Sequence, residues 1–164
     1  MKVKVTRHTQ FKDSAYRHLV ACKQMLKDSK SPQCKSGDKK YLESEAYYLS
    51  GYIVELMLSY SVCSYLKIHQ NCEDSDPFTK DKNRFKIHNL KLKYQYALDK
   101  GCLGLRGLVL LSRIHENDDV QKLFDNWDIT YRYVPSNNLP FQSLNTYIDV
   151  LENLYQTILK KYPI

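Results

Sequence analysis

The sequence predicts an all-α protein, an up-and-down antiparallel bundle of four to five main helices plus a short helix, in a single domain over residues 1–164. Apolar residues recur every three or four positions in several long segments, which is the spacing of one helix face. The segment Glu45–Leu66 is apolar on nearly every side, as expected of a helix at the centre of a bundle. No stretch offers a strand that could pair into a sheet.

The first two predicted helices form a hairpin. An apolar stripe predicts a helix over Thr9–Ser29, and Ser31-Pro32 and Gly37-Asp38 then punctuate a connection. A second helix is predicted from Lys39 to about His69, antiparallel to the first, with one carboxylate, Glu55, in the middle of its apolar run. The stripe of the first helix consists of Phe11, Ala15, Leu19, Cys22 and Leu26.

A polar segment separates the hairpin from the next helices. Residues Asn71–Asn83 are predicted to form the longest loop, the most mobile one, with its tip in solvent. A third helix is predicted over Asn89–Leu98 and ends at Lys100-Gly101, because a glycine just after a basic last turn is a common stop. A fourth helix is predicted over Leu103–His115.

The last third of the chain contains two further helices. Asp118-Asp119 begin a short helix through Trp127, since acidic side chains favour the positive end of a helix. Asp128–Asn138 is predicted as a structured connection, and Pro140 then lies near the first turn of a last helix that reaches about Lys161. The last helix carries the apolar stripe Leu144, Ile148, Leu151, Leu154, Tyr155 and Ile158.

The formal net charge of +7 is concentrated in Met1–Arg7, Lys27–Lys40 and Lys80–Lys93. This excess favours attraction to a polyanion such as nucleic acid. The other interpretation is a lysine-rich solvated surface, because only six arginines are present. The fourteen tyrosines recur mostly at helical spacing, which predicts core and interface positions; examples are Tyr41, Tyr48, Tyr52 and Tyr60.

Cysteine usage and the N-terminus predict a cytoplasmic protein. The five cysteines are odd in number and widely spaced, which indicates reduced thiols rather than a disulfide framework or a zinc site. No apolar stretch follows the charged N-terminus, so neither a signal peptide nor a membrane anchor is expected. The sequence contains no glycine-rich phosphate loop and no metal-site spacing, so no cofactor and no metal are expected.

Glu55 is the first candidate for a functional residue. A buried carboxylate costs free energy unless a donor pairs with it, and His88, Arg106 and Arg132 are the candidate partners. Glu55 could orient a functional arginine or histidine, or it could hold the bundle in register.

Arg84 and His88 are four residues apart, which places both on one helix face if a helix spans them. Such a pair could bind phosphate or share a proton. The alternative is that His88 belongs to the cap region of the third helix, its ring bonding a neighbouring backbone group.

Arg132 follows Trp127 and lies between two tyrosines. An arginine among aromatic rings can stack on them, and its planar fork suits phosphate or carboxylate. The alternative is an internal ion pair with Glu55 or Asp128.

Three elements in a fixed order resemble the bacterial branch of the HEPN domain family, named for higher eukaryotes and prokaryotes nucleotide-binding. They are Tyr48–Glu55 (YLSGYIVE), His88-Asn89-Leu90, and Trp127 with Arg132-Tyr133 after four intervening residues. The resemblance covers almost the whole chain. It implies a helical bundle, commonly a homodimer, found in toxin–antitoxin and antiviral systems, and many such domains are metal-independent ribonucleases.

The usual catalytic signature of those ribonucleases, an arginine followed after four to six residues by histidine, is absent. Arg132 comes closest, but Asn137 stands where histidine is needed, and asparagine is no acid or base at neutral pH. Ser59 replaces the lysine common four residues after the core glutamate.

These departures favour a non-enzymatic dimeric module that binds a nucleotide, RNA or a partner protein near Arg132. One alternative is a ribonuclease with a non-standard site, in which Arg132 stabilises phosphate and His88 or His115 moves protons. Another is a structural or antitoxin-like regulatory subunit. The candidate binding residues are Arg132, Tyr133, Trp127, Glu55, His88, Asn137 and Arg84.

Overall fold

The computed structural model describes residues 7–106, 117–132 and 139–163, and within these ranges the chain is a bundle of helices without strands. An isolated bridge between Arg7 and Gln70 is the one β-type pairing in the described part. The all-α prediction is therefore confirmed. None of the described helices is long and apolar enough to cross a lipid bilayer.

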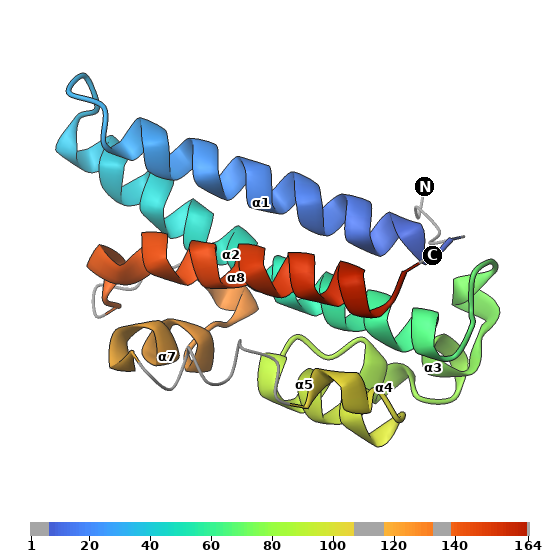
Figure 1. The fold of residues 1–164 in the computed structure, drawn as a ribbon. Helices are drawn as coiled ribbons and strands as arrows, with labels where there is room; N and C mark the ends of the chain where they lie inside the picture. The colour runs from blue at the N-terminus through green and yellow to red at the C-terminus, as the bar shows by residue number, and fades with distance from the viewer. Residues whose placement is uncertain (1–6, 107–116, 133–138, 164) are drawn as a thin grey trace.

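Three long helices form the main layer: α1 (Thr9–Ser29), α2 (Ser36–Tyr65) and α8 (Leu144–Lys161). Figure 1 shows α1 and α2 as an antiparallel hairpin with α8 alongside both, and each pair of these helices is in contact. The apolar stripes predicted for the first and last helices are buried in full. Helix α2 is buried on most sides between Ser44 and Cys63, which confirms its central position.

Helix α2 ends four residues before the predicted His69, because Lys67 adopts a left-handed conformation (φ 57°). The backbone N–H of Ile68 then donates to the carbonyl oxygen of Cys63 at 2.8 Å, which closes the helix end. Lysine, unlike glycine, does not indicate a left-handed conformation in a sequence. The apolar spacing alone therefore predicted an end of α2 that is too late in the chain.

The segment predicted to be the longest loop is instead three short helices, η1 (Cys72–Asp74), α3 (Asp76–Thr79) and α4 (Lys82–Phe85). Pro77, which looked like loop punctuation, is in the first turn of α3, where a proline is tolerated. Phe78 is buried rather than solvated, and its ring packs on those of Phe11 and Phe85, with centroids 6.0 and 4.6 Å apart. The prediction of a loop is therefore wrong, although Thr79 and Lys80, which follow Phe78, do face solvent.

Helix α5 (Leu90–Asp99) matches its predicted bounds. Asn89 Oδ1 accepts a hydrogen bond from the Leu92 N–H at 3.0 Å and caps the helix, and Gly101 (φ +93°) ends it in the left-handed conformation that favours glycine. The predicted fourth helix is wrong at its start, where the structure has the single turn η2 (Leu103–Leu105) followed by Arg106 in an extended conformation (ψ 132°). The rest of that prediction, residues 107–115, falls outside the described residues.

Helix α7 (Asp118–Asp125) is the predicted short helix, although it ends two residues before the predicted Trp127. Asn117 caps it by accepting from the N–H groups of Asp119 and Val120. The predicted structured connection begins as η3 (Ile129–Arg132), a single turn. Pro140 precedes another short turn, η4 (Phe141–Ser143), which leads directly into α8. The last helix ends at Lys161 as predicted.

The buried environment predicted for most cysteines is confirmed, and that of the tyrosines only in part, since Tyr16 and Tyr65 are 53% and 49% exposed. All five cysteines are free thiols in the structure, and four of them are buried. Tyr48 and Tyr60 are core residues, but Tyr41 is 70% exposed, since it lies in the first part of α2, where few elements cover the helix. Its prediction as a core or interface residue is not supported by the packing within this chain.

His8, at the start of α1, is the most enclosed imidazole among the described residues, with 3% of the residue exposed. Its Nδ1–H donates to the carbonyl oxygen of His69 at 3.3 Å, and its ring stacks on Tyr60 with centroids 5.4 Å apart. Nε2 has no partner in the described part of the chain. Burial lowers the pKa of His8, the bond to the His69 carbonyl opposes this, and the charges of His69 and Lys12 add to the lowering.

We expect acid to weaken the protein through His8. The pKa of His8 is lower in the folded than in the unfolded chain, so the unfolded chain binds more protons as the pH drops below the ordinary pKa of 6.5. The free energy of unfolding is therefore not reduced by His8 above this pH and falls below it. In His8→Phe the ring stays but cannot titrate. Urea unfolding at pH 7.5 and 5 measures the free energy of unfolding of wild type and of His8→Phe. Wild type should become less stable relative to the variant at pH 5. A difference that does not change with pH would contradict this account.

Candidate functional site

Glu55, in the middle of α2, lies between an exposed imidazole and a buried ammonium group. Its Oε2 accepts from His88 Nδ1 at 2.9 Å, and its Oε1 lies 3.8 Å from Lys93 Nζ. The exposed fractions of the three side chains are 13% for Glu55, 47% for His88 and 3% for Lys93. We call these three residues the Glu55 cluster.

The structure thus selects His88 from the three partners that the sequence proposed for Glu55. Arg106 is exposed and is not among the basic groups within ion-pair distance of Glu55 in the described residues. The side chain of Arg132 lies outside the described residues, so its pairing with Glu55 or Asp128 stays a prediction.

Lys93, on α5, is the partner that the sequence analysis missed. Its ammonium donates to the carbonyl oxygen of Phe85 at 2.5 Å and lies over the Phe85 ring, 4.8 Å from the centroid. Burial lowers the pKa of Lys93 to about 8, and the Glu55 carboxylate opposes that shift. One signal was available in the sequence: Lys93 follows Leu90 by three residues and precedes Ala97 by four, so it occupies the apolar stripe of α5.

His88 lies in the connection between α4 and α5, directly before the cap residue Asn89. The interpretation that its ring bonds a backbone group of the cap region is wrong, because the ring bonds a carboxylate 33 residues away and Asn89 caps the helix. With Nδ1–H donating to Glu55, the other ring nitrogen, Nε2, is left to accept a proton or contact a ligand.

Arg84 and His88 do not share a helix face. Helix α4 ends at Phe85, and Arg84 instead pairs with Asp99 at 2.5 Å and lies over the Tyr96 ring. The predicted phosphate-binding pair is therefore not formed by these two side chains in this structure. The spacing argument failed because the helix that it requires ends between the two residues.

Aromatic side chains of α2 and of the turn after α7 flank the cluster. The Tyr52 ring lies 6.4 Å from that of His88 and 5.6 Å from that of Trp127, both edge to face. Trp127 is 5% exposed, and its Nε1–H donates to the carbonyl oxygen of Tyr48 at 3.0 Å. Its indole lies against Gly51, so Trp127 is a packing residue beneath the site rather than a surface for a ligand.

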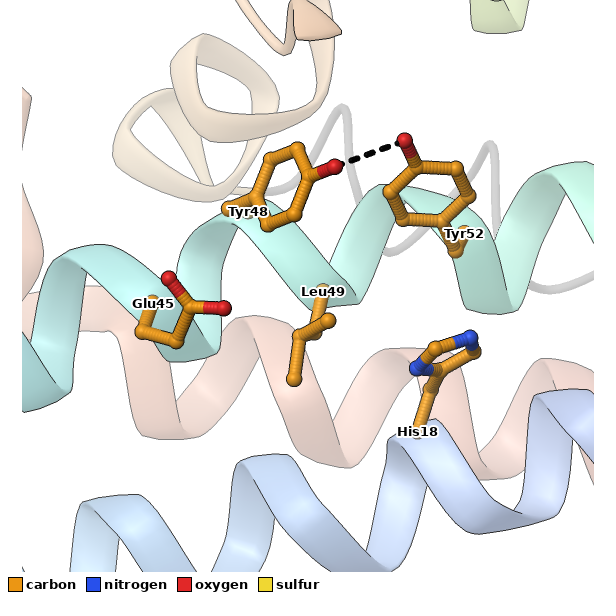
Figure 2. Close-up of a pocket in the computed structure, with 5 residues that line it drawn as sticks. All are labelled: His18, Glu45, Tyr48, Leu49 and Tyr52. Atoms are coloured by element: carbon orange, nitrogen blue, oxygen red, sulfur yellow. Dashed lines mark hydrogen bonds between the residues drawn. The ribbon is translucent and has the colours of Figure 1, made fainter. Parts of the chain in front are cut away.

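Tyr52 also lines a pocket of about 280 Å³ between α1 and α2, which Figure 2 shows. The hydroxyl groups of Tyr48 and Tyr52 are hydrogen-bonded at 2.8 Å. The imidazole of His18, on α1, also lies beside Tyr52, and its ring centroid is 5.7 Å from that of Tyr52. The residues that line the pocket are His18, Glu45, Tyr48, Leu49 and Tyr52.

The remaining predicted site residues are not brought to the cluster by the described part of the chain. Tyr133 and Asn137 lie outside the described residues, as does His115, so their predicted roles stay predictions. Ser59, at the position where the resemblance expects lysine, donates its hydroxyl to the backbone carbonyl of Glu55 at 2.9 Å. The ammonium group near Glu55 comes from α5 instead, as Lys93.

The chain around His88 is rich in exposed cations. Between residues 80 and 91 the basic side chains on the surface are Lys80, Lys82, Arg84, Lys86 and Lys91. Three of them form ion pairs: Lys80 pairs with Asp76, Arg84 with Asp99 and Lys91 with Asp125. Lys86 lies over the ring of Phe78. The segment on either side of His88 therefore carries an excess of exposed cations, while the carboxylates of Glu55 and Asp128 lie near the imidazole itself.

No group of three or more histidine, cysteine, aspartate or glutamate side chains in the described ranges is arranged to hold a metal ion. Comparisons of the chain with models of protein families, with curated proteins and with solved structures found no match.

Proposed function

We propose that this chain is a helical module that binds RNA or a nucleotide, and that His88, held by Glu55, is the residue that contacts phosphate. The observation that carries the proposal is the 2.9 Å bond from His88 Nδ1 to a largely buried carboxylate, with the imidazole itself half exposed. When Nε2 of this fixed, exposed imidazole carries a proton, it donates to a phosphate oxygen, and the ring loses little side-chain entropy on binding. The exposed lysines beside it add attraction to a polyanion.

The resemblance to HEPN domains supports the same proposal and extends it. It suggests a homodimer, and a place in a toxin–antitoxin or antiviral system in the cytoplasm, with a cognate protein as a possible partner. A structural or antitoxin-like subunit remains the alternative without a nucleic-acid ligand. Sedimentation at micromolar concentration distinguishes a dimer from a monomer.

A second candidate function is metal-independent RNA cleavage. The observation in its favour is that a carboxylate bonded to Nδ1 of an exposed histidine is the arrangement of an oriented general base. Nε2 of His88 would then accept a proton from the attacking hydroxyl group of RNA. The absence of an arginine with the usual spacing to a histidine favours binding over cleavage.

Replacing His88 with alanine is expected to weaken the binding of a short single-stranded RNA about tenfold at low salt, as loss of one charge-assisted hydrogen bond predicts. The slope of log K against log salt should fall by about 0.7, the value for one phosphate contact on a single strand. Fluorescence anisotropy of an end-labelled RNA measures both quantities. His69→Gln, an exposed histidine at the far end of α2, is the matched control and should bind as wild type does.

Two outcomes would contradict the binding proposal: equal RNA affinity of wild type and His88→Ala, or no binding of RNA or a nucleoside triphosphate by wild type. The same samples, incubated in EDTA and separated on a gel, test the second candidate. RNA cleavage by wild type that is lost in a folded His88→Ala variant would establish a nuclease. RNA that is bound and left intact supports the binding module.

A further inference from the structure

The pocket between α1 and α2 is lined by residues that do not belong to the Glu55 cluster. Glu45, Tyr48, Leu49 and Tyr52 lie at intervals of three and four residues along one face of α2, and His18 faces them from α1. Figure 2 shows the imidazole of His18 directed toward Tyr52, with the Glu45 carboxylate at the other end of this row. The pocket therefore combines three aromatic rings with one carboxylate.

The two tyrosine rings stand nearly perpendicular to each other, with an interplanar angle of 82° and centroids 5.2 Å apart. Their hydroxyl groups bond each other at 2.8 Å, which fixes this corner. The ring of His18 lies nearly parallel to that of Tyr52, at 29°. The two perpendicular tyrosine rings thus form a corner in which a compact group fits better than a planar base does.

Among the residues that line the pocket, Glu45 supplies the negative charge. None of the ion pairs within the described residues involves Glu45, which is exposed at the rim. Burial lowers the pKa of His18, and the neighbouring Arg17 lowers it further, so a positive charge on this ring is disfavoured. The Arg17 guanidinium itself donates to the hydroxyl of Ser14 at 2.9 Å.

We propose that this pocket binds the alkylated ammonium group of an organic cation. Aromatic rings attract such a cation through their negative faces, and a carboxylate at the rim adds a charge of the opposite sign. The perpendicular tyrosines and His18 form the walls, Leu49 contacts the alkyl groups, and Glu45 faces the charge. The proposal does not depend on the RNA-binding function, since Glu45 and Leu49 are not part of the Glu55 cluster.

The test compares choline with its neutral isostere 3,3-dimethylbutan-1-ol, each titrated into the full chain and followed by NMR. Choline should bind about tenfold more tightly than the alcohol, the size of effect that a partly desolvated cation–π contact produces. Glu45→Gln should reduce the affinity for choline severalfold and leave the alcohol unchanged. Tyr52→Leu should abolish both interactions, whereas Glu43→Gln, a carboxylate on the same helix outside the pocket, should change neither.

A short peptide with trimethyl-lysine, beside its unmethylated form, distinguishes a protein-borne cation from a free one. Binding of choline alone identifies a free small cation, and binding of the methylated peptide identifies a modified side chain; either result supports the pocket. Equal affinity for choline and the alcohol, an unchanged affinity in Glu45→Gln, or no binding of either cation would overturn the proposal. Glu45→Gln alters an exposed side chain, so a folding defect does not confuse this comparison.

Discussion

The Gly51→Ala variant is expected to lose about 3 kcal/mol or more of its free energy of unfolding, at the upper end of the range for overpacked cores. A Cβ atom at Gly51 would lie 1.8 Å from Cε2 and 2.1 Å from Cδ2 of the Trp127 ring. The indole has no room to withdraw, because it is buried and bonded through Nε1 to the carbonyl oxygen of Tyr48. The variant must therefore displace Trp127, lose that bond and open the contact with Tyr52.

Urea unfolding followed by the fluorescence of Trp127, the single tryptophan, measures this loss directly. Gly37→Ala is the matched control, because Gly37 also belongs to α2 but a Cβ there meets nothing within 4 Å. The control should be neutral or slightly stabilising, since alanine favours a helix more than glycine does. Equal stability of the two variants would show that the indole does not pack on Gly51.

The second large effect is expected from Glu55→Gln, which should lower the free energy of unfolding at pH 7 by about 2 kcal/mol. One pH unit below its pKa of about 8, Lys93 can lose its proton for about 1.4 kcal/mol, which limits the cost of leaving its charge unpaired. The substitution removes the negative charge beside a buried ammonium, and Lys93 is left without its counter-ion. Glu152→Gln is the matched control, because Glu152 pairs with Lys23 on the surface. An exposed pair of that kind contributes at most about 1 kcal/mol.

The pH dependence identifies Lys93 as the cause. Its pKa of about 8 in the folded chain is below the ordinary 10.5, so the unfolded chain binds more protons between these values. The penalty for burying this charge is full below pH 8 and disappears as the pH approaches 10.5. The cost of Glu55→Gln should therefore shrink between pH 7 and 9.

A double variant completes this test. Glu55→Gln with Lys93→Met has no buried charge at either position, and it should recover most of the stability that Glu55→Gln alone loses. No recovery in the double variant, or a cost of Glu55→Gln that is the same at pH 7 and 9, would contradict the pairing of Glu55 with Lys93.

Local patterns predicted the helices whose ends carry recognisable residues. The bounds of α1 follow from its apolar stripe, and those of α5 from the Asn89 cap and the glycine at position 101. The patterns failed where a residue took an uncommon role. Lys67 ends α2 in a left-handed conformation, and Pro77 begins a helical turn instead of interrupting one.

The site was predictable only in part, because its contacts join distant segments. A carboxylate in an apolar helix demanded a partner, and His88 was one of the candidates. Local spacing could not show that α4 ends between Arg84 and His88, which separates that pair. Lys93 was overlooked because lysine is usually a surface residue, and its place on an apolar stripe was the one signal of burial.

The measurement that tests the central claim most directly is NMR of the imidazole nitrogens of ¹⁵N-histidine-labelled protein during titration with a short RNA, with His88 assigned from the spectrum of His88→Gln. We expect the hydrogen-bonded Nδ1 of His88 to be visible before RNA is added, and the His88 ring resonances to shift on binding while those of His69 stay in place. RNA binding that leaves the His88 resonances unchanged, or no shift of any histidine when RNA is in excess, would contradict the assignment of His88 as the phosphate contact.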